Sequence, residues 1–311
     1  MVGYAACVSA TTTIAEALRS TVSRLAGKTP APQAEAEELL GRLLELARPQ
    51  LYLDRERVLA SAENTRLDTW VERRLAGEPV QYITGRAAFR GHDLVVSTAV
   101  LIPRPETEWL VEAVLEMLRG ERERWVAPRV LDLGTGSGAI ALALAAECPT
   151  AVVTATDASA PALEIAASNA AALGLAPRVR LRVGHWFDAI GADDRFEVVV
   201  SNPPYVAEGE ADQLPEEVRA HEPPRALYSG STGLESLREI IELAPRHLVT
   251  RGLLALELAE MRAAEVAAWL EGDRDWQNVE LRDDLAGRPR ILLARRQAGP
   301  AIAPAQWNEE S

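Results

Sequence analysis

The sequence has few cysteines and no long hydrophobic run. Only two of its 311 residues are cysteines, Cys7 and Cys148. This argues against a disulfide framework and makes a reducing cytoplasm the simplest compartment. The most apolar run, Ala139 to Ala146, is too short to span a bilayer. The segment Met1 to Thr13 lacks a basic start followed by a long apolar stretch, so we expect no signal peptide. Histidine and cysteine do not cluster with ligand spacing, and we expect no metal site.

Positive charge is also scarce. The formal net charge is −13, of which the first 90 residues hold +1 and the remainder −14. Proteins that grip duplex nucleic acid usually have a basic face, because phosphate contacts supply most of the affinity. The charge therefore predicts no direct nucleic-acid partner. An apolar fraction of 48% is ample for a packed core, and the length suggests two domains or one large one.

Residues 1–80 predict an N-terminal helical bundle. Thr13 and Glu16 have the spacing of a capping box, followed by an apolar face. Pro32 suits the first turn of a second helix with a strong leucine stripe. A third helix is predicted over Leu67 to Leu75, before a glycine and a proline. Helical bundles of this kind often recognise a partner.

The rest of the chain has the pattern of an α/β domain. Residues 81–100 predict a β-hairpin linker, with Tyr82-Ile83-Thr84 and Asp93 to Val96 as strands around Gly91. Residues 101–296 alternate strands and helices, which predicts a seven-stranded, mostly parallel sheet covered on both faces. The predicted strands are Arg129–Leu133, Ala151–Asp157, Val179–Val183, Phe196–Ser201, Leu253–Leu258, Val279–Asp283 and Ile291–Ala294. The predicted helices are Gly138–Glu147, Ala160–Leu173, Leu234–Leu248 and Arg262–Leu270. Residues 297–311 predict a flexible tail.

A glycine loop and an acidic strand end predict a nucleoside site. The first strand leads directly into Gly134, Thr135, Gly136, Ser137 and Gly138. Glycine has no Cβ, so a ligand can lie against bare backbone there. The spacing differs from the dinucleotide fingerprint, and the Lys-Ser/Thr ending of a P-loop is missing. Asp157 ends the next strand, where a carboxylate can accept hydrogen bonds from both ribose hydroxyls of an adenosine. A helix N-cap is the structural alternative for Asp157.

The tetrapeptide Asn202-Pro203-Pro204-Tyr205 follows the fourth predicted strand and is the most informative motif in the chain. Its two prolines rigidify the backbone and have no N–H, while their carbonyls remain free as acceptors. The Asn202 side chain offers a further acceptor oxygen. A planar amide or an exocyclic amine fits such a site, with Tyr205 stacked on its plane. The tetrapeptide alone leaves both acceptors open, and a rigid strand-ending turn is its structural alternative.

Taken together, these motifs resemble class I methyltransferases, and further segments resemble one family among them. That family is the bacterial glutamine methyltransferases of peptide-chain release factors, the HemK/PrmC family. The additional matching segments are Gly77-Glu78-Pro79, Leu101 to Glu108, Gly184-His185-Trp186-Phe187 and His221 to Leu227. The resemblance runs from about residue 12 to residue 296.

The resemblance implies a Rossmann-like class I fold and S-adenosyl-L-methionine as cofactor, with S-adenosyl-L-homocysteine as product. Its cofactor contacts would be Gly134 to Gly138, Asp157, Trp186 and Asn202, with the Arg104–Glu108 stretch nearby. Core packing is the structural alternative for Trp186, and a surface salt-bridged turn is the alternative for Arg104–Glu108. The residues Asn202 to Tyr205 would hold and activate the substrate glutamine. The helical domain would contact the release factor and help present its Gly-Gly-Gln loop. We expect a cytoplasmic monomer.

Several positions depart from the family pattern. Ala259, Ala263 and Ala264 stand where a glycine and a Gln-Gly pair are common, Arg288 where an acidic residue is common, and His221 where an aromatic is frequent. These departures lie outside the proposed reaction site. They bear on how well a release factor would fit and on local geometry more than on the reaction. The alternatives are methylation of a ribosomal-protein glutamine, N6-methylation of adenine in nucleic acid, and an inactive binding module. The intact glycine loop and tetrapeptide argue against the last.

Overall fold

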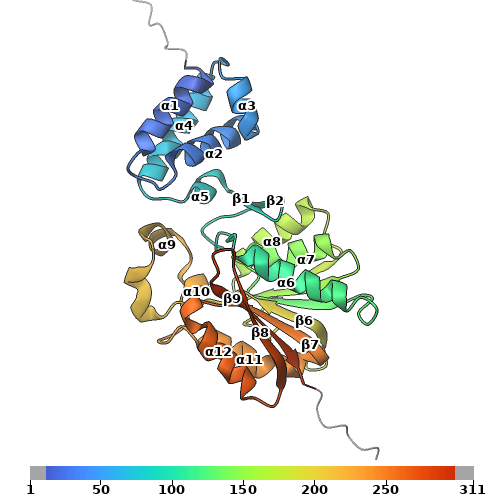
Figure 1. The fold of residues 1–311 in the computed structure, drawn as a ribbon. Helices are drawn as coiled ribbons and strands as arrows, with labels where there is room; N and C mark the ends of the chain where they lie inside the picture. Colours follow the sequence, from blue (N-terminus) through green and yellow to red (C-terminus); the bar gives the residue numbers. More distant parts are fainter. Residues whose placement is uncertain (1–11, 298–311) are drawn as a thin grey trace, which may run out of the picture. The chain divides into compact units, whose positions relative to one another are not determined.

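The computed structural model describes residues 12–297 and divides them into two compact units (Figure 1). The helical unit consists of the described residues up to Arg86 together with Glu216–His221. The sheet unit consists of Ala87–Pro215 and the described residues from Glu222 onward. The chain therefore leaves the sheet unit for six residues and then returns to it. Cys7 and the predicted tail beyond Gln297 lie outside the described residues.

The helical unit is a small bundle around an apolar core. Its helices are α1 (Ile14–Leu25), α2 (Pro32–Leu44), α3 (Arg48–Leu53), α4 (Ser61–Leu75), α5 (Val80–Thr84) and α9 (Glu216–His221). The predicted capping box at Thr13 and Glu16 is confirmed, with each side chain accepting from the other residue's backbone N–H. Pro32 occupies the first turn of α2. The third predicted helix begins six residues earlier than expected, and α3 was not predicted.

The predicted strand at Tyr82-Ile83-Thr84 is wrong, because these residues form the end of helix α5. This helix follows Pro79 and ends at Gly85, whose φ of 73° only glycine adopts at little cost. Tyr82 and Ile83 are both buried, so the alternation expected of a strand is absent. The hairpin itself exists slightly later, as β1 (Arg86–Phe89) and β2 (His92–Val95). Its two turn residues, Arg90 and Gly91, both have positive φ, as in type I′ turns.

The sheet unit contains a seven-stranded sheet with the order β5-β4-β3-β6-β7-β9-β8. Its strands are β3 (Arg129–Leu133), β4 (Val152–Asp157), β5 (Val179–Val183), β6 (Phe196–Ser201), β7 (Leu248–Glu257), β8 (Trp276–Asp283) and β9 (Pro289–Arg296). The first five pair in parallel, whereas β9 is antiparallel to both β7 and β8. The predicted fold class is confirmed.

Helices cover both faces of this sheet (Figure 1). Along β3, Val130 packs with α6 (Thr107–Gly120), α7 (Ala139–Glu147) and α8 (Ala160–Ala172). Its neighbour Leu131 packs on the other face with α11 (Glu235–His247) and α12 (Ala263–Glu271). Successive strand residues point to opposite faces, so a fully covered strand is apolar throughout. Helix α6 was not predicted, although its buried residues repeat at helical spacing.

The order of the strands creates a crevice at one edge of the sheet. From β3 the chain continues to β4 and β5 on one side, then returns to β6 on the other side of β3. The loops after β3 and β6 therefore diverge at the carboxyl ends of adjacent strands. Such a topological switch point is where open α/β sheets bind ligands.

Candidate active site

The glycine loop between β3 and α7 adopts a conformation that favours glycine. Gly134, Gly136 and Gly138 have φ values of 70°, 56° and 85°. The backbone N–H groups of Gly134 and Thr135 both donate to the carbonyl of Thr156 in β4, which anchors the loop. A Cβ at Gly134 would lie 3.1 Å from a ring carbon of Trp186. The first glycine is therefore required both by its φ and by the close approach of that indole.

Asp157 holds the glycine loop at the end of β4. Its Oδ2 accepts a hydrogen bond from the Gly136 N–H at 2.9 Å, and its Oδ1 accepts from the Ser159 N–H at 2.8 Å. The N-cap of α8 is Ser159, whose hydroxyl accepts from the Ala162 N–H. The N-cap alternative for Asp157 is thus wrong. The carboxylate instead lies against the loop and lines the cavity described below.

Thr135 and Ser137 are buried beneath the loop and are not among the residues that line the cavity. The Thr135 hydroxyl donates to Oδ2 of Asp132 at 2.6 Å, and the Ala141 N–H donates to the same oxygen at 3.1 Å. Burial raises the pKa of Asp132 to about 7. The two hydrogen bonds lower this pKa, whereas the negative charge of the nearby Asp157 raises it further. Nothing in the sequence was a reason to select Asp132. Its buried carboxyl holds the glycine loop and the first turn of α7 through these two hydrogen bonds.

Trp186 lies in the loop after β5, and its indole ring packs against Gly134 of the glycine loop. Its φ is 41°, an uncommon value for a residue with a side chain, and its backbone carbonyl accepts a hydrogen bond from the Thr156 hydroxyl at 3.0 Å. The indole is 8% exposed, and its Nε1–H has no hydrogen-bond partner. The ring is therefore held against Gly134 by packing and by its strained backbone, and Trp186 is among the residues that line the cavity.

Asn202 is the first residue after β6 and is held by a hydrogen bond to α6. Its side-chain Nδ2 donates to the hydroxyl of Thr107 at 3.0 Å, and this hydroxyl donates to Oε2 of Glu257 at 2.7 Å. Asn202 and Pro204 line the cavity, whereas Pro203 is buried and Tyr205 does not border it. Burial raises the pKa of the Tyr205 phenol to about 12, with the nearby Glu257 carboxylate acting in the same direction. Tyr205 is therefore neutral at physiological pH.

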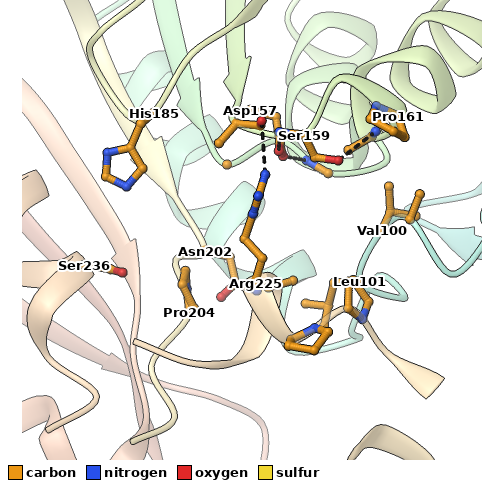
Figure 2. Close-up of a pocket in the computed structure, with 18 of the residues that line it drawn as sticks. Val100, Leu101, Asp157, Ser159, Pro161, His185, Asn202, Pro204, Arg225 and Ser236 are labelled. Carbon is orange, nitrogen blue, oxygen red and sulfur yellow. Dashed lines mark hydrogen bonds between the residues drawn. The ribbon is translucent and has the colours of Figure 1, made fainter. Parts of the chain in front are cut away.

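One cavity of about 940 Å³ joins the glycine loop to the tetrapeptide (Figure 2). Of the predicted site residues, it brings together Gly134, Gly136, Asp157, Trp186, Asn202 and Pro204. The wall residues that were not predicted as site residues include Ala99 to Leu101, Ala158 to Ala162, Gly184-His185 and Pro223 to Ala226. In Figure 2 the Arg225 side chain extends from beside Asn202 toward Asp157, and its guanidinium donates to the Ala158 carbonyl at 3.1 Å.

The Arg104–Glu108 stretch borders the tetrapeptide rather than the cavity itself. Arg104 pairs with the buried Glu222 at 2.5 Å, and Thr107 contacts Asn202. The departure at Arg288 has a local partner, because its guanidinium pairs with Asp284 at 2.7 Å. Within residues 12–297, no three His, Cys, Asp or Glu side chains are grouped as metal ligands. No helix in that range is long and apolar enough to cross a membrane.

The fold and the site define a Rossmann-like methyltransferase of class I. A family model described as PrmC N-terminal domain matches residues 16–85, and one described as methyltransferase small domain matches residues 111–229. A methyltransferase from Pyrococcus furiosus of known structure superposes with a TM-score of 0.50 at 21% identity, covering 77% of this chain and 100% of that one. This likeness concerns the fold.

Closer relatives identify the family. A release factor glutamine methyltransferase from Koribacter versatilis is 42% identical over 285 residues, covering 91% of this chain and 99% of the relative. Another from Xylella fastidiosa is 44% identical over 263 residues, covering 85% and 93%. The chain belongs to the release factor glutamine methyltransferase family.

Proposed function

We propose that this chain transfers a methyl group from S-adenosylmethionine to the side-chain amide nitrogen, N5, of the glutamine in the Gly-Gly-Gln motif of peptide-chain release factors. The observation that carries the proposal is the shared cavity, into which both the Asp157 end of β4 and the Asn202 loop open. A donor site and an acceptor site are thereby joined without intervening backbone. Membership of the family supports glutamine as the acceptor.

The residues around the glycine loop fit an adenosine cofactor. Gly134 and Gly136 offer bare backbone, and Asp157 offers a carboxylate at the strand end. Trp186 offers a flat aromatic surface on which an adenine would stack. Bound S-adenosylmethionine would supply an electrophilic methyl group and leave as S-adenosylhomocysteine, while the amide nitrogen would release one of its two hydrogens as a proton to water. Gly138 contributes to this site indirectly, since a Cβ there would approach Leu142 in α7 to 3.0 Å.

The tetrapeptide supplies the acceptor side of the reaction. The Asn202 side-chain oxygen and the Pro203 carbonyl would accept the two hydrogens of a glutamine amide. These hydrogen bonds would raise electron density on the nitrogen and aim its lone pair at the methyl group. Orientation of this kind contributes up to about 7–11 kcal/mol to lowering a barrier. Tyr205 does not line the cavity, and its raised pKa makes it unsuited to act as a base.

An exocyclic adenine amine presents the same donor pair, so nucleic acid is the main rival acceptor. The net charge of −14 beyond residue 90 disfavours it, since a nucleic acid needs basic contacts to its phosphates. A glutamine of a ribosomal protein is the closer rival. We assign recognition of the release factor to the helical unit, whose matching family model is separate from the methyltransferase one. Such a substrate implies a cytoplasmic enzyme.

A labelling experiment tests the proposal. The purified chain is incubated with methyl-labelled S-adenosylmethionine and, in parallel, with a class 1 release factor, ribosomal protein or DNA. We expect label on the release factor alone, located by peptide mass spectrometry at the glutamine of its Gly-Gly-Gln motif. A release factor carrying glutamate at that position is the matched control and should remain unlabelled. Label only on ribosomal protein or DNA would contradict the proposal.

A further inference from the structure

Three side chains from three elements form a hydrogen-bonded chain that ends at the acceptor loop. Asn202 follows β6, Thr107 begins α6, and Glu257 ends β7. The distances are 3.0 Å from Asn202 Nδ2 to Thr107 Oγ1 and 2.7 Å from Thr107 Oγ1 to Glu257 Oε2. Thr107 is 4% exposed and Glu257 is 1% exposed. The contact is therefore shielded from water, which would otherwise compete for each hydrogen.

Strand pairing brings the two ends of this chain together. Ser201 of β6 pairs with Leu256 of β7 in parallel register. Asn202 and Glu257 are each the next residue, so they lie side by side where the two strands end. Thr107 reaches the same point from the first turn of α6. None of the three could move without disturbing a strand end or a helix start.

The chemistry of the hydroxyl fixes the direction of the chain. A threonine hydroxyl has one hydrogen to donate, and the Glu257 carboxylate, which is ionised at a pH above its pKa of about 7, can then only accept. Because Thr107 donates to Glu257, it can only accept from Asn202. The amide NH₂ must then face Thr107, which leaves the Asn202 Oδ1 on the other side. Amide oxygen and nitrogen are nearly equal in shape, so it is this donor–acceptor logic that sets the orientation.

We infer that Thr107 and Glu257 are positioning residues that hold the Asn202 carbonyl oxygen toward the acceptor nitrogen. The inference rests on the proposed function, in which that oxygen accepts a hydrogen from the substrate amide. Without the Thr107 hydroxyl, a half-turn of the Asn202 side chain would present NH₂ to an NH₂ group. Two donors would then face each other, and the substrate nitrogen would be misplaced.

The burial of Glu257 is difficult to explain by packing alone. An acidic side chain removed from water is costly unless it is paired or hydrogen-bonded. Burial raises the pKa of Glu257 to about 7, while the Thr107 hydroxyl and the charges of Arg290 and Arg104 oppose that rise and the Glu106 charge adds to it. A leucine or methionine would fill the space without this cost. Such groups concentrate at functional sites.

The competing explanation is that Thr107 merely fastens α6 to β7. The two explanations predict different effects of substitutions at Thr107, both on which residue restores activity and on whether kcat or cofactor affinity changes. A fastening role would tolerate a residue of equal shape, whereas a directing role needs the hydroxyl itself. A fastening role would also lower stability and cofactor affinity together, whereas a directing role would lower kcat.

The test compares Thr107→Val, which keeps the shape and removes the hydroxyl, with Thr107→Ser, which keeps the hydroxyl. Activity is measured as methyl transfer from S-adenosylmethionine to a release factor. We expect kcat to fall about ten- to a hundredfold in Thr107→Val, as is typical when a supporting hydrogen bond is lost. Thr107→Ser should stay within about threefold of the parent. Thr154→Val, which removes a buried hydroxyl of β4 that has no role in the site, is the matched control.

A double variant tests whether the loss of activity in Thr107→Val arises through Asn202. If Thr107 acts through Asn202, Thr107→Val should cost nothing further in an Asn202→Ala background. Affinity for S-adenosylhomocysteine, measured by calorimetry, should equal that of the parent in the Thr107 single variants and stay within a few-fold of it where Asn202 is replaced. An undiminished kcat in Thr107→Val, or equal losses in Thr107→Val and Thr107→Ser, would overturn the inference. Absence of release factor methylation by the parent chain would instead refute the proposed function.

Discussion

At the scale of single residues, the site depends on side chains that specific hydrogen bonds or packing contacts hold in one orientation. Asp157 is fixed by two backbone N–H donors, and Asn202 by one hydroxyl acceptor. Trp186 is fixed by packing, with its indole N–H left without a partner. Rigid placement of this kind favours catalysis by orientation, since the groups need not reorganise during the reaction.

Asn202→Ala should separate binding from turnover. The substitution removes one acceptor from the nitrogen-binding loop but leaves the glycine loop and Asp157 unchanged. We expect kcat to fall by about a hundredfold or more, as when one oriented hydrogen-bonding group is removed elsewhere. Calorimetry with S-adenosylhomocysteine should give an affinity within a few-fold of the parent. Turnover equal to that of the parent would refute the acceptor role of Asn202.

Glu257 should make the stability of the fold depend on pH. Its pKa is about 7 in the folded chain, above the ordinary value of 4.5. The folded state thus holds a proton that the unfolded state releases, so the stabilisation is complete below pH 4.5 and is lost as pH rises through 7. The shift corresponds to roughly 3 kcal/mol.

Urea unfolding of the parent and of Glu257→Gln at several pH values between about 5 and 8 measures this dependence. The stability of the variant should decline less steeply with rising pH. Asp132 has a pKa raised in the same direction and contributes equally to both proteins, so some slope should remain. Parallel curves for the two proteins would be inconsistent with a raised pKa at Glu257.

At the scale of elements, the loop after β3 and the loop after β5 are built as a pair. Gly134 leaves no room for a side chain beneath Trp186, and Thr156 of β4 bonds to both loops. Gly134→Ala should therefore displace the indole and weaken cofactor binding. The φ of 70° adds a strain of about 1–2 kcal/mol.

Gly174→Ala is the matched control for Gly134→Ala. Gly174 has a φ of 68° but open space where its Cβ would be. Both variants should lose stability in thermal unfolding because both are strained, and Gly134→Ala should lose more because its Cβ also meets Trp186. Affinity for S-adenosylhomocysteine should fall only in Gly134→Ala. Equal affinities in the two variants would show that the approach of Trp186 does not matter for the cofactor.

The elements that the sequence predicted well are those with a single strong periodicity. The buried strands β3, β4 and β6 and the edge strand β5 were each predicted within a residue. Tyr82 to Thr84 was misassigned because three apolar or β-branched residues fit a strand and a helical turn equally. Pro79 and Gly85 on either side are the signals that favour a helix.

The site was predictable only where its residues are neighbours in sequence. The glycine loop, Asp157 and the Asn202 tetrapeptide each follow a strand, and the parallel sheet brings such ends together. Thr107 and Glu257 carry no local signal, since they lie 95 and 150 residues from their bonding partners in the chain. Their meeting depends on the β6–β7 register and on a helix that was not predicted.

At the scale of the whole molecule, the helical unit is assembled from two separate stretches of chain. Arg74 of α4 links them, pairing with Glu35 at 2.7 Å and with Glu217 of α9 at 2.8 Å. The Arg74 side chain is only 5% exposed. Removing it would leave two carboxylates close together without their cation.

Arg74→Ala should lower the free energy of unfolding by about 3–5 kcal/mol, the usual cost of breaking a buried ion pair from one side. Differential scanning calorimetry should show the loss as a lower melting temperature. Arg24→Ala is the control, because Arg24 also bridges two carboxylates but at an exposed site, where the expected change is within about 1 kcal/mol. Similar losses in both variants would argue against a special role for Arg74.

The excursion of Glu216–His221 into the helical unit also constrains how such a protein can change during evolution. A recombination event that exchanged only the first 86 residues would replace α4 but keep α9. The incoming domain would then meet a segment whose Glu217 has lost Arg74. An exchange of the front of the chain would therefore have to supply its own cation for Glu217, although about 130 residues separate the two stretches.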